Sequence, residues 1–414
     1  MPEPQSGPLT SYPKHKIKVL LLENIHSNAV SLFEEDGLSV QLLKGALSEP
    51  ELGERIRDVH VLGIRSKTRV SAATLAQARR LLALGCFCIG TNQVALDAAN
   101  LRGVPVFNAP FGNTRSVAEL VLAEVIVLAR KLGDRSMLMH QGHWEKSAQG
   151  CVEVRGKTLG IVGYGHIGSQ VGVLAEGVGM RVLFYDILKK LPLGNNRPTR
   201  SFEELLPEVD FLTLHVPATP LTRNMIGAQQ LAAMKPGAKL LNASRGSVVQ
   251  IGPLAAALRS GQIGGAAIDV FPDEPAVNQA EFDSELRGLP NVFLTPHIAG
   301  ATTEAQEAIG REVATSLLKF INQGISAGAV NFPQVEPPPL DGRHRILHVH
   351  RNVPGVLSQI NRIVSEAKAN IESQVLSTDA SIGYLVMDLD KTVSDEVHAK
   401  MAKLDASIRS RILY

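Results

Sequence analysis

The sequence has few cysteines: Cys86, Cys88 and Cys151 are the three in 414 residues. Three thiols are too few for a disulfide framework and fit a protein of the reducing cytosol. Cys86 and Cys88 lie two residues apart in an apolar stretch, so we expect them to be buried strand cysteines. No carboxylate or cysteine completes a recognisable metal-binding set with His140 and His143. We therefore predict that the protein binds no metal.

An excess of one charge is also missing. The 42 basic and 40 acidic residues leave a net charge of +2, which gives no electrostatic basis for binding nucleic acid or an anionic membrane. Long apolar runs are lacking too, since the most hydrophobic predicted helix, 116–132, carries four charged residues and is too short to cross a bilayer. Residues 1–16 are polar and proline-rich, without the apolar core of a signal peptide. We predict a cytoplasmic protein whose partners include neither nucleic acid nor a membrane.

The length of 414 residues is large for a single core and predicts two or three domains. From residue 16 onward, apolar segments typical of strands, such as 16–22, 59–64 and 104–107, alternate with segments of helical periodicity. This alternation predicts a parallel, doubly wound sheet. No glycine-rich phosphate loop occurs in this first part of the chain. We therefore expect an α/β domain without a nucleotide site of its own.

The stretch 157–186 has the pattern of a dinucleotide-binding unit. A short apolar strand precedes Gly163, Gly165 and Gly168, and a helical segment and a second strand follow, ending at Asp186. The first glycine permits a tight turn, the second lets a pyrophosphate approach the backbone, and the third lets the helix pack on the strand. An acid at position 186 can accept hydrogen bonds from the adenosine ribose and favours NAD over NADP. A glycine-rich turn in another kind of α/β protein is the alternative.

Three polar residues follow predicted strands downstream of this pattern: Arg245, Glu274 and His297. The carboxyl ends of parallel strands line the ligand crevice of an open α/β sheet, so these side chains can converge. An imidazole can exchange a proton with a substrate hydroxyl, a carboxylate can orient that imidazole, and a guanidinium can bind a substrate carboxylate. The set predicts oxidation or reduction of a 2-hydroxy or 2-oxo acid, although each residue alone is also compatible with a structural role.

The C-terminal part has a different pattern. Residues 331–342 contain four prolines and no helical or strand periodicity, which indicates a semi-rigid linker. Residues 343–414 then give the order βαββαβ, which predicts a ferredoxin-like sandwich. A unit of about seventy residues suits sensing or interaction better than catalysis, although a fold alone does not establish a role.

These pieces together resemble the D-isomer-specific 2-hydroxyacid dehydrogenase family, in the branch that carries a C-terminal ACT domain. The resemblance covers nearly the whole chain after the N-terminal tail and rests on GCFCIGTNQV at 85–94, GYGHIG at 163–168, NASRG at 242–246, AIDVF at 267–271 and TPHIAG at 295–300. It implies an α/β fold of two doubly wound, parallel-sheet (Rossmann-like) domains and a C-terminal βαββαβ ferredoxin-like ACT domain. The implied boundaries are 1–113 with 304–335 for the substrate-binding domain, 114–303 for the NAD-binding domain and 343–414 for the ACT domain.

The resemblance also assigns residues by position. It gives catalytic roles to Arg245, Glu274 and His297. The basic residues of LGIRSKTRV, at a predicted strand end, suit a substrate phosphate, although a solvated basic loop is the other reading. Trp144 would contact a neighbouring subunit, and Lys146 would reach that subunit's site. The implied cofactor-binding residues are Gly163, Gly165, His166, Ile167, Gly168, Asp186, His215, Val216, Pro217, Ala243, Ser244, Asp269 and Gly300. The implied substrate-binding residues are Arg65, Ser66, Asn113, Lys146, Arg245 and His297.

The activity that the resemblance implies is NAD-dependent oxidation of 3-phospho-D-glycerate to 3-phosphohydroxypyruvate, the first step of L-serine biosynthesis, by a homotetramer. It further implies feedback inhibition by L-serine, bound by His350, Asn352 and Asn370 across a pair of ACT domains. Two alternatives stay open. One is dehydrogenation of another 2-hydroxy acid, such as 2-hydroxyglutarate to 2-oxoglutarate. The other is an NAD-sensing scaffold like the transcriptional corepressors that share this fold.

Overall fold

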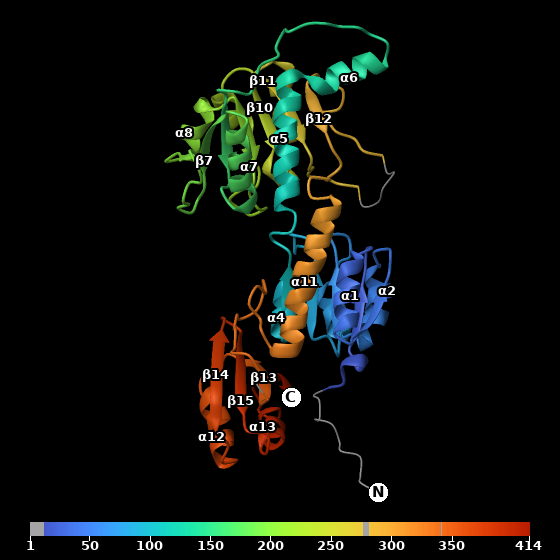
Figure 1. Cartoon of the computed structure of the whole chain (residues 1–414), viewed down its shortest axis with the longest axis vertical. Coiled ribbons are helices and arrows are strands. Elements are labelled where there is room, and N and C mark those ends of the chain that lie inside the picture. The colour runs from blue at the N-terminus through green and yellow to red at the C-terminus, as the bar shows by residue number, and fades with distance from the viewer. Residues whose placement is uncertain (1–11, 276–280, 341) are drawn as a thin grey trace. The chain divides into compact units, whose positions relative to one another are not determined.

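The structure is a computed structural model that describes residues 12–275, 281–340 and 342–414 (Figure 1). The chain forms a first compact unit, Met1–Gly112 with Gln306–Tyr414, and a second, Asn113–Ala305. The N-terminal tail predicted at 1–16 lies outside the described residues as far as residue 11, and Lys14–Lys16 form a short 3-10 helix, η1.

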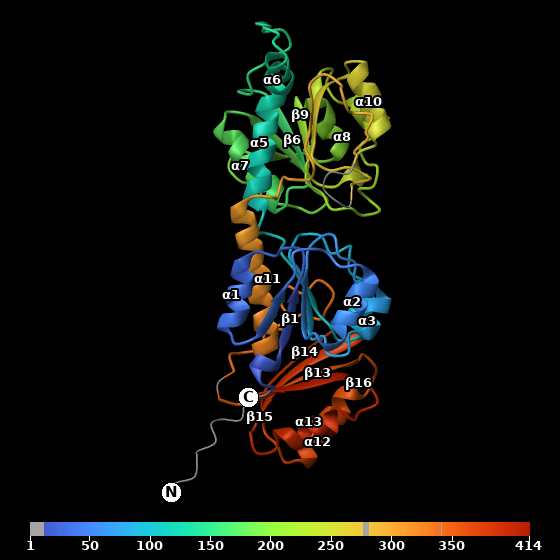
Figure 2. The ribbon, with the colours of Figure 1, turned by 90° about the vertical axis from the view of Figure 1, so that its right-hand side faces the viewer.

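The first unit contains a five-stranded parallel sheet, as the sequence predicted. Figure 2 shows α1 and α11 on one face of it and α2 and α3 on the other, which is the doubly wound arrangement. In sheet order the strands are β2 (Ser39–Leu42), β1 (Lys18–Leu21), β3 (Val61–Ile64), β4 (Ala83–Cys86) and β5 (Val106–Asn108). The helices are α1 (Ser27–Glu35), α2 (Glu49–Arg55), η2 (Ile56–Asp58), α3 (Ala72–Gln77), α4 (Leu96–Leu101) and α11 (Thr303–Gln323), which enters this unit at Gln306.

The C-terminal residues form the predicted βαββαβ unit around an antiparallel sheet. Its strands, in sheet order, are β14 (Ile371–Thr378), β15 (Ile382–Leu389), β13 (His344–Arg351) and β16 (Ser407–Leu413), and its helices are α12 (Val356–Glu366) and α13 (Ser394–Met401).

Both faces of this antiparallel sheet are covered. The helices pack on one face, where Ile346 meets Ile360 and Val397. The other face contributes Leu347, Tyr384 and Val386 to the same hydrophobic core as Phe320 of α11 and Phe332 of the proline-rich segment. Coverage on both sides explains why every residue of β15 is buried, instead of alternate ones. The C-terminal sheet therefore shares one core with the first α/β domain.

The second unit is built on a parallel sheet that has seven strands in the part of the chain described. Helices α5 and α7 contribute to the core cluster on one face of this sheet and helices α8, α9 and α10 to the cluster on the other, so the sheet is doubly wound. In sheet order the strands are β12 (Val292–Leu294), β11 (Ile263–Ile268), β10 (Ala238–Asn242), β9 (Phe211–Leu214), β6 (Thr158–Val162), β7 (Arg181–Tyr185) and β8 (Arg197–Pro198). The helices are α5 (Thr114–Arg130), α6 (Leu132–His140), α7 (His166–Gly177), α8 (Phe202–Leu205), η3 (Leu206–Glu208), α9 (Ala228–Ala233), η4 (Gly246–Val248) and α10 (Ile251–Arg259).

Local details differ from the sequence reading. The helix predicted at 116–132 ends at Arg130, because Lys131 adopts a left-handed backbone with φ of +53° that separates α5 from α6. Cys86 is buried in β4, whereas Cys88 lies beyond the end of that strand and is half-buried. In the described residues we find no helix with both the length and the apolar character needed to span a membrane.

Candidate active site

The turn between β6 and α7 leaves room for an anion at a helix N-terminus. Gly163 has a φ of +90°, and a Cβ on it would lie 2.3 Å from the carbonyl oxygen of His215. A Cβ on Gly168 would lie 2.1 Å from the carbonyl oxygen of Gly163, so only glycine lets α7 pack this closely on the turn. At Gly165, which precedes α7, a Cβ would meet no described atom within 4 Å. Open space at the start of a helix fits a pyrophosphate group.

Asp186 is held against this glycine turn. It follows β7, and its Oδ2 accepts a hydrogen bond of 2.8 Å from the backbone N–H of Tyr164. Its Oδ1 accepts another of 2.8 Å from the N–H of Leu188. These bonds fix a negative charge beside the turn, where it suits a ribose with free hydroxyls and repels a 2′-phosphate.

His215 and Val216 lie on the other side of the turn, at the end of β9. The imidazole Nε2 of His215 is 3.0 Å from the hydroxyl of Thr213. Burial lowers the pKa of His215 to about 3, so its ring is neutral at physiological pH. The Val216 side chain lies 2.9 Å from the position that a Cβ on Gly163 would occupy. These residues, which the resemblance linked to the cofactor, therefore meet at the glycine turn; Pro217 follows them directly in the chain.

Arg245 is positioned by the residues around it in the NASRG segment after β10. The amide of Asn242 donates a hydrogen bond of 3.0 Å to the carbonyl of Arg245 and accepts from the N–H and the hydroxyl of Ser244. The Arg245 guanidinium donates to the carbonyl of Ser244 at 2.7 Å. A Cβ on Gly246 would lie 1.9 Å from the carbonyl carbon of Phe271, so glycine brings this segment onto the loop that carries Glu274.

Glu274 and His297 form a pair. The Nδ1 of His297 lies 2.8 Å from the Oε2 of Glu274, and the Oε1 of Glu274 accepts a hydrogen bond of 3.1 Å from the N–H of Phe271. The hydrogen bond to Glu274 raises the pKa of His297 above its ordinary value, against the opposing effect of burial. Burial acts to raise the pKa of Glu274, but the bonds from His297 and Phe271 and the charges of His297 and Arg245 outweigh it and lower that pKa. Nε2 of His297 remains the ring nitrogen available to a substrate.

The loop that carries His297 is anchored by Asp269, which is 1% exposed. The carboxylate of Asp269 accepts hydrogen bonds from the Thr295 hydroxyl at 2.6 Å and from the backbone N–H groups of Ile298 and Ala299 at 2.8 Å and 2.9 Å. Its backbone carbonyl accepts from the N–H of His297 at 2.8 Å. His297 itself has a φ of +55°, a left-handed conformation that is rare outside glycine and costs energy unless its surroundings impose it. The structure thus gives Asp269 a positioning role that sequence reasoning missed.

Comparison with known proteins adds the family. The model of the D-isomer specific 2-hydroxyacid dehydrogenase NAD binding domain matches residues 122–299, and the model of the AHAS small subunit-like ACT domain matches residues 346–409. A D-3-phosphoglycerate dehydrogenase of Dictyostelium discoideum is 55% identical over 98% of this chain and 100% of its own. The chain belongs to the D-isomer-specific 2-hydroxyacid dehydrogenase family. It is an oxidoreductase whose cofactor is NAD, and both expectations are confirmed.

A second relative and a solved structure of the family also match this dehydrogenase over most of its length. The D-3-phosphoglycerate dehydrogenase of Escherichia coli (strain K12) is 50% identical over 98% of this chain and 99% of its own. Among solved structures, a D-lactate dehydrogenase from Aquifex aeolicus, complexed with NAD and lactic acid, is 27% identical with a TM-score of 0.67 and covers 76% of this chain and 100% of that one. The fold predicted from the sequence, two parallel doubly wound sheets and an ACT domain, is confirmed.

Asn113 and Gly300, also predicted from the resemblance, meet in the second unit of the dehydrogenase. A Cβ on Gly300 would lie 2.3 Å from the side-chain nitrogen of Asn113. The Oδ1 of Asn113 is buried and has no hydrogen-bond partner among the residues that the structure describes. Lys146 is exposed beside Trp144, which is 80% exposed, in a hollow that Arg135 also lines. The structure shows no hydrogen bond or ion pair between Lys146 and another described residue.

Arg65 and Ser66 belong to the first unit, in the loop after β3. This loop wraps around the carboxylate of Glu23, which is 8% exposed. Glu23 accepts hydrogen bonds from the backbone N–H groups of Arg65 at 3.1 Å, Lys67 at 3.0 Å and Thr68 at 2.8 Å. The carbonyl of Arg65 accepts from Gln93 at 2.7 Å. Glu23 organises the basic loop, and only its position directly after a strand could have signalled this from the sequence.

The predicted effector residues lie at two ends of the C-terminal sheet. His350 pairs with Gly383 of β15, and Asn352 follows β13 at that same end, where its amide donates to the Asp379 carbonyl at 2.7 Å. Asn370 directly precedes β14, whose first residue pairs with Leu389, the partner of His344. His350 lies six positions along β13 from His344, or about 20 Å at the usual rise per residue. One chain therefore does not bring Asn370 to His350.

Proposed function

We propose that the protein oxidises 3-phospho-D-glycerate to 3-phosphohydroxypyruvate with NAD, as the first step of L-serine biosynthesis. The observation that carries this proposal is the His297–Glu274 pair at 2.8 Å, in an NAD-binding domain whose relatives at 50–55% identity are named D-3-phosphoglycerate dehydrogenase. The catalytic, cofactor and substrate roles that the resemblance assigned are part of the proposal.

His297 takes the proton of the substrate's 2-hydroxyl through Nε2. Glu274, held by the Phe271 N–H, accepts the hydrogen bond from Nδ1 and stabilises the imidazolium that forms. Arg245 binds the substrate carboxylate with its planar guanidinium. NAD, when bound, accepts the hydride from C2 of the substrate. The fixed carboxylate of Asp186 and the open space at Gly165 support the placing of its ribose and pyrophosphate.

Substrate choice is assigned to the basic loop around Glu23. Three of its backbone N–H groups bond to that buried carboxylate, so the loop has a fixed shape. The side chains of Arg65 and Lys67 take no part in these bonds and can bind a substrate. A phosphate carries enough negative charge to engage two such side chains, whereas 2-hydroxyglutarate would present a single carboxylate. The loop therefore favours a phosphorylated acid over the alternative substrates.

The test compares substrates and one variant. We expect kcat/KM for 3-phospho-D-glycerate to exceed that for D-glycerate by about a hundredfold or more, because each charge-assisted hydrogen bond to the phosphate contributes about tenfold. Arg65→Met should lower kcat/KM for the phosphorylated acid about tenfold and leave that for D-glycerate nearly unchanged. Equal rates on both acids, or faster oxidation of 2-hydroxyglutarate, would favour a different 2-hydroxy acid. Absence of turnover on every 2-hydroxy acid, with NADH-dependent partner binding, would favour a scaffold.

We further propose the domain boundaries and assembly implied by the resemblance: a substrate-binding domain of 1–113 with 304–335, an NAD-binding domain of 114–303, an ACT domain of 343–414, and a cytoplasmic homotetramer. An indole that is 80% exposed at Trp144 supports burial against a second subunit. Size measurement in solution would test the assembly. L-serine is the proposed effector, and the separation of Asn370 from His350 supports a site shared by two ACT domains.

A point substitution tests this regulation better than deletion of residues 343–414, because deletion would expose the core around Phe320 and Phe332. Asn370→Ala should leave kcat unchanged and weaken inhibition by L-serine about tenfold or more, since one polar contact to the effector is lost. Gln359→Ala, an exposed amide on α12, is the matched control and should leave inhibition as it was. Initial rates measured against serine concentration decide. Unchanged inhibition in Asn370→Ala would remove this residue from the effector site.

A further inference from the structure

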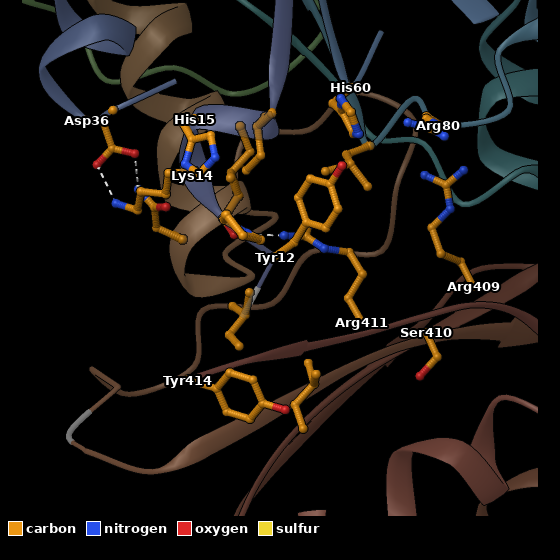
Figure 3. A pocket seen from close by; sticks show the side chains of 18 of the residues that line it. Tyr12, Lys14, His15, Asp36, His60, Arg80, Arg409, Ser410, Arg411 and Tyr414 are labelled. Atoms are coloured by element: carbon orange, nitrogen blue, oxygen red, sulfur yellow. Dashed lines mark hydrogen bonds and ion pairs between the residues drawn. The ribbon is translucent and has the colours of Figure 1, made fainter. Parts of the chain in front are cut away.

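A cavity of about 1260 Å³ lies in the first unit, away from every residue assigned so far to catalysis, cofactor or effector (Figure 3). Its walls come from the segment before β1, from the connection between α3 and β4, and from strand β16 of the C-terminal sheet. The first α/β domain and the C-terminal domain therefore both contribute to it.

The lining of this cavity is strongly cationic. Asp36 is the single acid among the described lining residues, and the ammonium of Lys14 already pairs with it at 2.9 Å. Histidines 15, 60 and 398 add groups that can donate hydrogen bonds. The permanently charged lining residues are Lys14, Arg79, Arg80, Arg409 and Arg411. After the Lys14–Asp36 pair is set aside, four guanidinium groups remain, and one of them, that of Arg80, lies 3.7 Å from the exposed carboxylate of Asp58.

Arg409 and Arg411 are alternate residues of β16, so they point to the same side of the strand. Their guanidinium groups donate to backbone carbonyls, Arg409 to that of Leu81 and Arg411 to that of Ile321 at 2.9 Å. Within the described part of the chain neither arginine forms an ion pair. The Arg411 guanidinium lies over the Phe320 ring, 5.9 Å from its centroid, and its Nη1 is buried without a hydrogen-bond partner. Burial and the charges of Arg411 and Arg102 lower the pKa of Arg409 to about 10. Two like charges are held on the same strand, and no side-chain carboxylate of the described residues pairs with either.

Aromatic surface lies beside these charges. The centroids of the Tyr12 and His60 rings are 5.5 Å apart, and Figure 3 shows the Tyr12 ring beside the end of the Arg411 side chain. Burial, together with the charges of Arg80 and Lys18, lowers the pKa of His60, so its ring is neutral and can face an uncharged part of a ligand. The volume is that of a small-molecule site and exceeds what one phosphate needs.

We propose that this cavity binds a small molecule that carries two or more phosphate groups. Guanidinium groups bind phosphate oxygens through paired hydrogen bonds, and four of them match more charge than one phosphate provides. The ligand would neutralise Arg409 and Arg411 on the C-terminal sheet and Arg80 on the first α/β domain at once. Its binding would therefore stabilise the packing of these two domains.

Inorganic tripolyphosphate is the probe, titrated calorimetrically into the full-length protein with NADH saturating, so that the cofactor site is occupied. We expect binding that is weakened about tenfold by Arg80→Met and about tenfold by Arg409→Met, because each removes a charge-assisted hydrogen bond. Arg362→Met, at an exposed position on α12, is the matched control and should bind as the wild type does. Binding to the loop around Glu23 would not respond to either cavity variant.

Two results would overturn the proposal. One is equal affinity in wild type, Arg80→Met and Arg409→Met. The other is a rise in Tm with tripolyphosphate no larger than with sodium chloride at the same ionic strength. Arg409→Met also loses its bond to Leu81, so Arg80→Met, whose side chain is 56% exposed, keeps the test valid should the first variant fold poorly.

Discussion

Replacing His297 with asparagine is expected to lower kcat about a hundredfold or more while NADH binds as before, the usual size of a general acid–base contribution. Asparagine is chosen over alanine because residue 297 has a φ of +55°, which asparagine tolerates better than other non-glycine residues. The loop should therefore keep its bonds to Asp269, and the loss of turnover reports the missing imidazole. Steady-state rates and titration of NADH fluorescence measure the two quantities.

Glu274→Gln tests the other half of the pair. The carboxylate raises the pKa of His297, and oxidation requires the neutral imidazole, so activity should fall as the pH drops through that pKa. Removing the negative charge lowers the pKa of His297 and moves the acid limb of the pH profile to lower pH.

The matched control for His297→Asn is His140→Asn, at the exposed end of α6, which should change neither the rate nor the pH profile. Full turnover in His297→Asn would exclude this residue as the base.

The sequence predicted the fold well because the relevant signals are local. Strand–helix alternation gave both parallel sheets, and the βαββαβ order gave the C-terminal unit. The break between α5 and α6 was missed because it depends on the left-handed backbone of Lys131, a residue with no special tendency toward that conformation. The packing of Phe320 and Phe332 on the C-terminal sheet was missed because it is a tertiary contact. The apolar pattern of each segment shows that it has a buried face, but not which other segment covers that face.

In the candidate site, too, local signals could be predicted from the sequence and contacts between distant segments could not. Arg245, Glu274 and His297 could be found from their positions after strands, since parallel strands end at one edge of a sheet. The residues that hold them could not, because buried anchors leave no periodic signal. Asp269 was predicted as a cofactor contact, and its role as acceptor of hydrogen bonds from the loop of His297 was not foreseen. Glu23, which organises the basic loop from a distance of some forty residues in the chain, was not singled out at all.

Glu124→Gln is expected to stabilise the second unit, and increasingly so as the pH rises. Glu124 lies in α5, is 1% exposed, and neither of its carboxyl oxygens has a hydrogen-bond partner among the described residues. Burial, and next the charge of Asp269, raise its pKa to about 8. Between its ordinary pKa and this raised pKa, Glu124 is protonated in the folded state and ionised in the unfolded state. The free energy of unfolding therefore falls as the pH rises toward 8, by a total on the order of 5 kcal/mol.

Glutamine has the shape of the protonated acid but no proton to lose, so the variant should match the wild type near pH 4.5 and exceed it near pH 8. A difference of this size corresponds to a Tm higher by roughly 10–20 °C for a unit of this length. Glu119→Gln, on the exposed face of the same helix, loses only a surface ion pair with Arg115 and should shift Tm little at any pH. Thermal unfolding at several pH values measures both. If the Tm of Glu124→Gln and that of the wild type change with pH in parallel, the buried carboxyl is not protonated in the folded protein. Asp269 would then tolerate the negative charge of Glu124.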